Sequence, residues 1–67
     1  MINEKYIGII EINEAVFTIV KRENKLIAGT VCNVGLIETH THTIDADFSL
    51  DENLQEFIEQ ITDSEDN

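Results

Sequence analysis

The sequence predicts an α+β fold, a four-stranded antiparallel meander sheet (ββββα) with one C-terminal amphipathic helix packed on one face. Three observations predict it. The first two thirds of the 67-residue chain are rich in β-branched and aromatic residues. These segments are separated by very short links, which force consecutive strands to be antiparallel neighbours. The last third carries apolar residues at helical spacing.

The four expected strands span residues 6–12, 15–22, 25–33 and 36–44. Asn13-Glu14 and Glu23-Asn24 form the first two links, and asparagine tolerates the positive φ that such turns need. Gly35 adopts positive φ without a steric penalty, so it suits the third turn. The simplest sheet therefore has the strand order 1-2-3-4.

Alternation along the first hairpin predicts apolar side chains on both of its faces. In the first strand, the opposing sets are Ile7 and Ile9 against Tyr6, Ile10 and Ile12. In the second strand, they are Phe17 and Ile19 against Val16 and Val20. Because a single helix covers only one face, the second apolar face predicts a homo-oligomer, most simply a homodimer.

The helix is predicted from its cap and its period. Ser49 and Glu52 have the spacing of a capping box, in which each side chain accepts a hydrogen bond from the other residue's amide. The apolar stripe that follows consists of Leu50, Leu54, Phe57, Ile58 and Ile61. We expect one domain over residues 1–62 and a disordered acidic tail over residues 63–67.

Cysteine content and chain length also limit the possibilities. The only cysteine, Cys32, excludes an internal disulfide, and a chain this short has a small core, which again favours self-association. Cys32 lies among small and β-branched residues, where we expect a buried, unreactive thiol. The first residues lack a basic and apolar signal sequence and no apolar run could span a bilayer, so we expect a cytoplasmic protein without a membrane partner.

The net charge of −10 is unevenly distributed along the chain. Residues 1–44 carry five acids and four bases, whereas residues 45–67 carry nine acids and no Lys or Arg. Direct binding to nucleic acid or to an anionic membrane requires a cationic surface, which this composition disfavours. On the helix, the partner-binding candidates form a second stripe of Glu52, Glu56, Glu59 and Asp63. The alternative is that this stripe is only a solvated face.

His40 and His42 are weak candidates for metal binding. On a strand they share a face with Glu38, and two imidazoles with one carboxylate could hold Zn²⁺ or Fe²⁺. Glu38 and His42 are too far apart along one strand to share an ion unaided. We expect instead a solvent-exposed edge strand in which these polar residues alternate with threonines.

No nucleotide-binding loop, nucleophile elbow or catalytic constellation is present in the sequence, so we expect neither an enzyme nor a cofactor. The predicted function is a small acidic interaction module that presents its helix to a basic protein surface. Such a module could inhibit or modulate a nucleic-acid-binding protein. The alternatives are a small metal-binding protein that uses His40 and His42, or a purely structural subunit of an oligomer.

Overall fold

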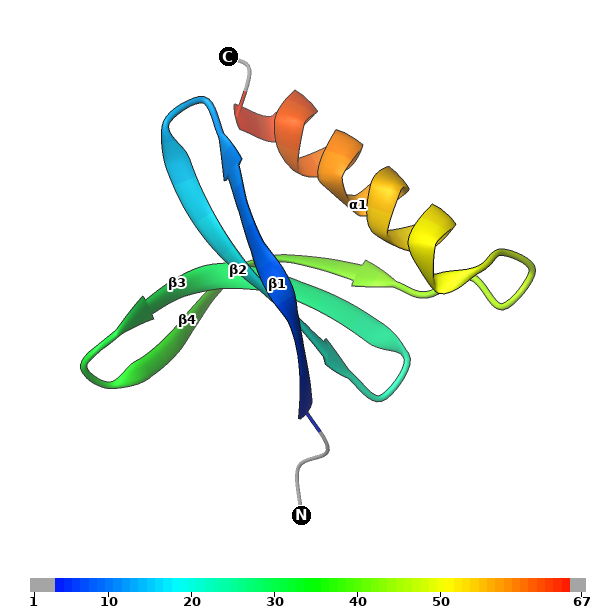
Figure 1. Cartoon of the computed structure of the whole chain (residues 1–67), viewed down its shortest axis with the longest axis horizontal. Helices are drawn as coiled ribbons and strands as arrows, with labels where there is room; N and C mark the ends of the chain where they lie inside the picture. Colours follow the sequence, from blue (N-terminus) through cyan, green and yellow to red (C-terminus); the bar gives the residue numbers. More distant parts are fainter. Residues whose placement is uncertain (1–3, 66–67) are drawn as a thin grey trace.

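A computed structural model describes residues 4–65 and confirms the α+β meander (Figure 1). The elements are β1 (Glu4–Ile12), β2 (Ala15–Arg22), β3 (Lys25–Cys32), β4 (Gly35–Thr43) and α1 (Leu50–Glu65). The strands form one antiparallel sheet in the order β1-β2-β3-β4. Each strand lies within two residues of its expected limits, because the links between them are so short.

The turns show which residues accept unusual backbone angles. Asn13 and Glu14 both have positive φ (50° and 71°), the pattern of a type I′ hairpin. In the second turn Glu23, and not Asn24, has positive φ, at 57°. Gly35 has a φ of 115°, a conformation that L side chains rarely adopt.

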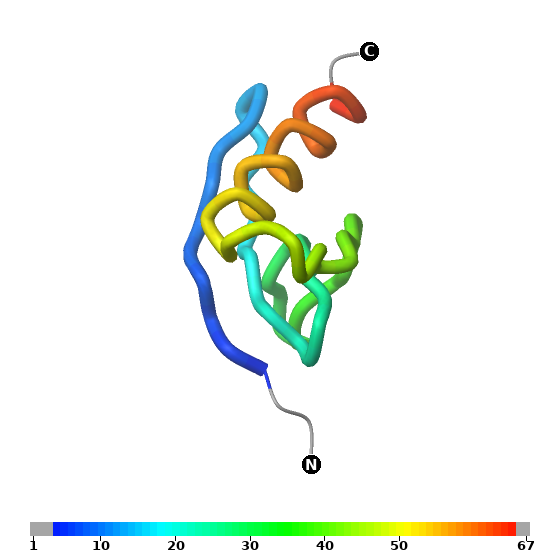
Figure 2. Tube along the Cα trace, turned by 90° about the vertical axis from the view of Figure 1, so that its right-hand side faces the viewer, coloured from blue at the N-terminus to red at the C-terminus, as the bar shows by residue number. Residues whose placement is uncertain are grey.

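The sheet is strongly twisted, so that the β1–β2 hairpin crosses the β3–β4 hairpin (Figure 1). Pairing between β2 and β3 is confined to the stretch from Thr18↔Gly29 to Arg22↔Lys25, and the hairpin tips diverge beyond it. Seen from the side of the helix, α1 lies between β1 and the end of β4 (Figure 2), and it contacts both edge strands. The helix therefore occupies one face of the sheet, and within residues 4–65 no element covers the other face.

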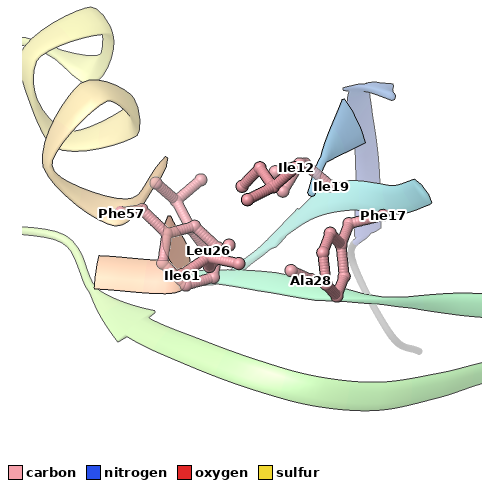
Figure 3. Packing of buried hydrophobic residues seen from close by; sticks show 7 residues of the cluster. All are labelled: Ile12, Phe17, Ile19, Leu26, Ala28, Phe57 and Ile61. Atoms are coloured by element: carbon pink, nitrogen blue, oxygen red, sulfur yellow. The ribbon is translucent and has the colours of Figure 1, made fainter. Parts of the chain in front are cut away.

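The core lies between that helix-covered face and α1. Phe57 and Ile61 of α1 gather around Leu26, while Phe17 packs beside Ala28 (Figure 3). Ile12 and Ile19 complete the fully buried cluster. Burial of these apolar side chains contributes roughly 25 cal/mol of stabilisation for each Å² of apolar surface that is removed from water. This burial holds the helix against the sheet.

Two β-bulges change the faces that simple alternation predicts. In β1 the pairing shifts between Tyr6↔Val20 and Gly8↔Ile19, so that Ile7 is the extra residue. Tyr6 therefore lies on the same side of the sheet as Ile9. The prediction that Tyr6 shares a face with Ile10 and Ile12 was wrong, because one inserted residue reverses the alternation beyond it.

The second bulge lies at Thr39 in β4, between His40, which pairs with Ala28, and Glu38, which pairs with Gly29. It brings the carbonyl of Ile37 so close to Gly29 that an added Cβ would overlap the carbonyl oxygen. Only glycine fits here without a backbone shift. The bulge also places Glu38 on the opposite face from His40 and His42.

The uncovered face is partly closed by its own residues. Val20 and Ile27 point away from the helix, yet both are buried. Arg22 donates from Nε to Glu4 Oε2 (2.7 Å) and from Nη2 to Glu38 Oε2 (2.8 Å), so one side chain links strands β1, β2 and β4. Nη2 also bonds Glu4 Oε2. The twist thus builds a small second cluster, rimmed by an ion-pair network.

Three sequence-based expectations are corrected at the ends of elements. Cys32 is exposed, because β3 projects beyond its pairing with β2. Leu50 is 39% exposed, since the buried line of α1 begins one turn later at Asn53. The helix continues through Glu65, so residues 63–65 of the expected tail are helical, and extending a formed helix is inexpensive. Residues 66–67 of that tail lie outside the described residues.

Candidate protein-binding surface

The start of α1 is held in place by a buried amide. Asn53 is 1% exposed and bonds the turn that leads from β4 into the helix. Its Oδ1 accepts from the Asp45 amide at 2.7 Å, and its Nδ2 donates to the carbonyls of Asp45 (3.0 Å), Phe48 (3.3 Å) and Ser49 (2.8 Å). The turn is therefore tied to the helix through one side chain, with every polar atom of that side chain satisfied.

This arrangement also determines the role of His42. Because a backbone amide can only donate, the Asn53 atom facing Asp45 must be the oxygen. The same oxygen lies 3.3 Å from His42 Nε2, which must then carry the proton and donate it. The His42 ring stacks on Phe57 with centroids 5.7 Å apart. His42 thus joins β4 to α1.

The predicted capping box is present at the helix N-terminus. The Glu52 amide donates to Ser49 Oγ at 3.2 Å, and the Ser49 amide donates to Glu52 Oε1 at 3.1 Å. Glu52 therefore has a structural role in addition to any role in binding. Its negative charge in the first turn also suits the positive end of the helix dipole.

All four predicted partner-binding residues are exposed on one side of α1, away from the buried line. These residues are Glu52, Glu56, Glu59 and Asp63. The helix carries no Lys or Arg, and its last turn has no basic residue to offset Asp63. All four bases of the chain lie on β1, β2 and β3. The structure thus separates an acidic helix from a sheet that holds every cation.

An exposed aromatic residue adjoins this acidic stripe, and the sequence reasoning did not anticipate it. Phe48 is 51% exposed and lies in the turn before the helix. With Gln55 and three of the glutamates it lines a shallow surface hollow, whose residues are Phe48, Glu52, Gln55, Glu56 and Glu59. The position of Phe48 in the sequence was the available signal. It is an aromatic residue that comes just before the helix cap and lies outside the apolar stripe of the helix.

Asn53 is the second residue that sequence reasoning missed. It lies four residues before Phe57 and eight before Ile61, so it belongs to the inward-facing side of the helix. A polar residue at such a position must find buried partners. The need of Asn53 for buried partners was therefore the signal that the sequence offered for its role.

The two histidines do not form the exposed pair that was expected. Both are half-buried on the helix-covered face, where the His40 ring packs edge-on against Phe17 with centroids 5.5 Å apart. The expectation of a solvent-exposed strand was wrong there, because α1 covers that part of β4. Glu38 lies on the opposite face with Arg22. Within residues 4–65, no group of three or more His, Cys, Asp and Glu side chains is placed to hold a metal ion.

Arg22 shows the largest electrostatic perturbation among the described side chains. The hydrogen bonds that its guanidinium donates to Glu4 first and to Glu38 second raise its pKa above the usual value. Arginine is charged at all ordinary pH values, so this network stays cationic at its centre. It is exposed and linked to the sheet, and it is separate from the acidic helix face.

The fold and this surface define a small α+β protein that carries an acidic helix on a meander sheet. No protein-family model, curated protein or solved structure matches the chain. In the part of the chain that the structure describes, α1 is the one helix, and it is too short and too polar to cross a membrane.

Proposed function

We propose that this chain is a non-enzymatic interaction module whose acidic helix binds a basic surface of another protein. The observation that carries the proposal is the exposed row of Glu52, Glu56, Glu59 and Asp63 on a helix without a single base. Like charges at these spacings each cost a few tenths of a kcal/mol. Selection for stability alone favours interspersed lysines, so the retained row supports a role in binding.

The hollow beside Phe48 supports a specific type of contact. Lys and Arg side chains combine a positive head with an apolar stem, and they pack well against aromatic rings. Phe48 offers such a ring next to Glu52 and Glu56. A basic side chain placed there makes an ion pair and a cation–π contact together.

The class of partner follows from the charge pattern. Basic surfaces that could pair with such an acidic helix are common on proteins that handle DNA or RNA. The proposed role is therefore to inhibit or modulate such a protein. Carboxylates on adjacent helical turns are spaced differently from phosphates, so the helix would match the overall potential rather than individual phosphate positions. The exposed thiol of Cys32 suits a reducing compartment, and we place this function in the cytosol.

A charge-neutralised variant tests the proposal. Glu56→Gln, Glu59→Gln and Asp63→Asn together remove three charges and leave the Glu52 cap intact. The matched control, Glu11→Gln, Glu14→Gln and Glu23→Gln, removes three exposed charges outside the helix, from β1 and from the first two hairpin turns of the sheet. Partners are captured from lysate at low and moderate salt, and binding of the recovered basic proteins is then measured by stopped-flow association.

We expect the helix variant to associate roughly ten-fold or more slowly and to show a weaker salt dependence, since complementary charge acts mainly on encounter. The sheet control should change both quantities much less. If the two variants slow association equally, binding depends on the total charge of the chain and not on the helix. If neither variant alters binding, the chain is better described as a structural subunit.

A further inference from the structure

The face of the sheet opposite α1 retains an apolar surface in the β1–β2 hairpin. Tyr6 and Ile9 are each 61% exposed and Val16 is 53% exposed. The register places all three on the side away from the helix, since Tyr6 pairs with Val20, Ile9 with Thr18 and Val16 with Glu11. Large apolar side chains clustered on one face of a small protein mark an interaction surface.

The centre of that face is already closed, although Val31 in β3 is also exposed on it. Val20 and Ile27 are buried there, with Arg22, Glu4 and Glu38 forming the rim. The Tyr6–Ile9–Val16 surface therefore borders a pre-formed cluster, and a partner that covers it extends this cluster. Such a partner need not reorganise the sheet.

The charges on the two faces of the molecule determine which partner can cover the Tyr6–Ile9–Val16 surface. The ionic residues that the register places on this face are Glu4, Glu11, Arg22, Lys25 and Glu38, three acids and two bases. The helix carries six acids and no base. A strongly basic partner is drawn to the helix, whereas a second copy of this anionic chain is repelled there. The nearly neutral face is the one that a second copy can approach.

The strand edges favour contact through the face over pairing of edges. Both edge strands are interrupted by bulges, at Ile7 in β1 and at Thr39 in β4. Bulges twist an edge away from regular pairing and so oppose the addition of another strand. The molecule measures 31 × 30 × 15 Å between Cα atoms, so a rectangle of 31 × 30 Å bounds each broad face. A standard interface needs about 800 Å² from each partner.

We propose that a second copy of this chain covers Tyr6, Ile9 and Val16 in a twofold-symmetric dimer, with the two acidic helices on opposite outer sides. Self-association supplies the burial that a small single core lacks. It also presents two acidic helices, which allows bivalent binding to a multimeric basic partner. This inference is independent of the proposed function, because it concerns the other face of the sheet.

Sedimentation equilibrium of the full chain between about 1 and 100 µM tests the dimer. Ile9→Glu places a charge from each copy in the proposed apolar interface and should weaken dimerisation at least about ten-fold. Val34→Glu is the matched control, because Val34 is 89% exposed in the β3–β4 turn, outside this surface. The control should dimerise like the wild-type chain. Circular dichroism verifies that each variant is folded, and Tyr6→Ser replaces Ile9→Glu if the latter does not fold.

A wild-type chain that stays monomeric at about 100 µM would overturn the proposal and leave the face to a different protein. A dimer that Ile9→Glu and Tyr6→Ser leave unchanged, or that Val34→Glu disrupts equally, would also overturn it. The dimer also requires a melting temperature that rises with protein concentration. The helix variants, which lie on the opposite face, should not alter dimerisation.

Discussion

Asn53 organises the turn between the sheet and the helix. Its side chain makes hydrogen bonds to Asp45, Phe48, Ser49 and His42 from a position with almost no exposure. These contacts place Phe48 beside the acidic stripe and aim the helix across the sheet. A side chain that takes no part in binding thereby positions the residues proposed to bind.

Replacing Asn53 with alanine should therefore destabilise the protein by at least about 2 kcal/mol, because several buried backbone groups lose their partner. Urea denaturation measures the loss. Gln60→Ala is the control, since it removes an exposed amide from the same helix, and its effect should stay within about 0.5 kcal/mol. A variant Asn53→Ala as stable as the control would show that water replaces the amide.

The helix depends on its packing more than on its own propensity. Its acidic stripe and its lack of a basic C-terminal residue disfavour an isolated helix. Phe57 and Ile61 are nevertheless fully buried against Leu26. The sheet therefore supplies the stability that allows α1 to carry unfavourable charges on its outer side.

Phe57→Ala should lower the free energy of unfolding by about 3 to 5 kcal/mol through loss of buried packing. Ser49→Ala should lower it by about 1 kcal/mol through loss of the helix cap. Glu56→Ala serves as the control on the exposed side and should leave stability nearly unchanged. Chemical denaturation ranks the three variants. If Glu56→Ala proves the most damaging, the orientation of the helix given above is incorrect.

For the whole molecule, the main electrostatic feature is the separation of an acidic helix from a sheet that holds all the bases. The charges on the helix repel one another over distances of about a Debye length, roughly 8 Å at physiological ionic strength. The Arg22 network opposes this trend only weakly, since exposed ion pairs contribute little. Repulsion within the helix should therefore dominate the response to salt.

Added sodium chloride should accordingly raise the melting temperature of the chain, with most of the rise below about 0.5 M, where screening develops. The variant with Glu56, Glu59 and Asp63 neutralised should start from a higher melting temperature and respond less to salt. Thermal scans at one protein concentration measure both. A melting temperature that falls with salt would assign the dominant role to attractive pairs such as Arg22–Glu4.

Local features of the sequence determined the strands, the turns, the capping box and the acidic stripe. Two-residue links, the Ser49–Glu52 spacing and the helical period each depend on residues close together in the chain, so their structural consequences follow without knowledge of the rest. Tertiary structure alone decided the bulges at Ile7 and Thr39, the burial of His40 and His42, and the contact between His42 and Asn53. These depend on how the two hairpins cross, which sets the contacts between distant residues and is encoded in no single segment.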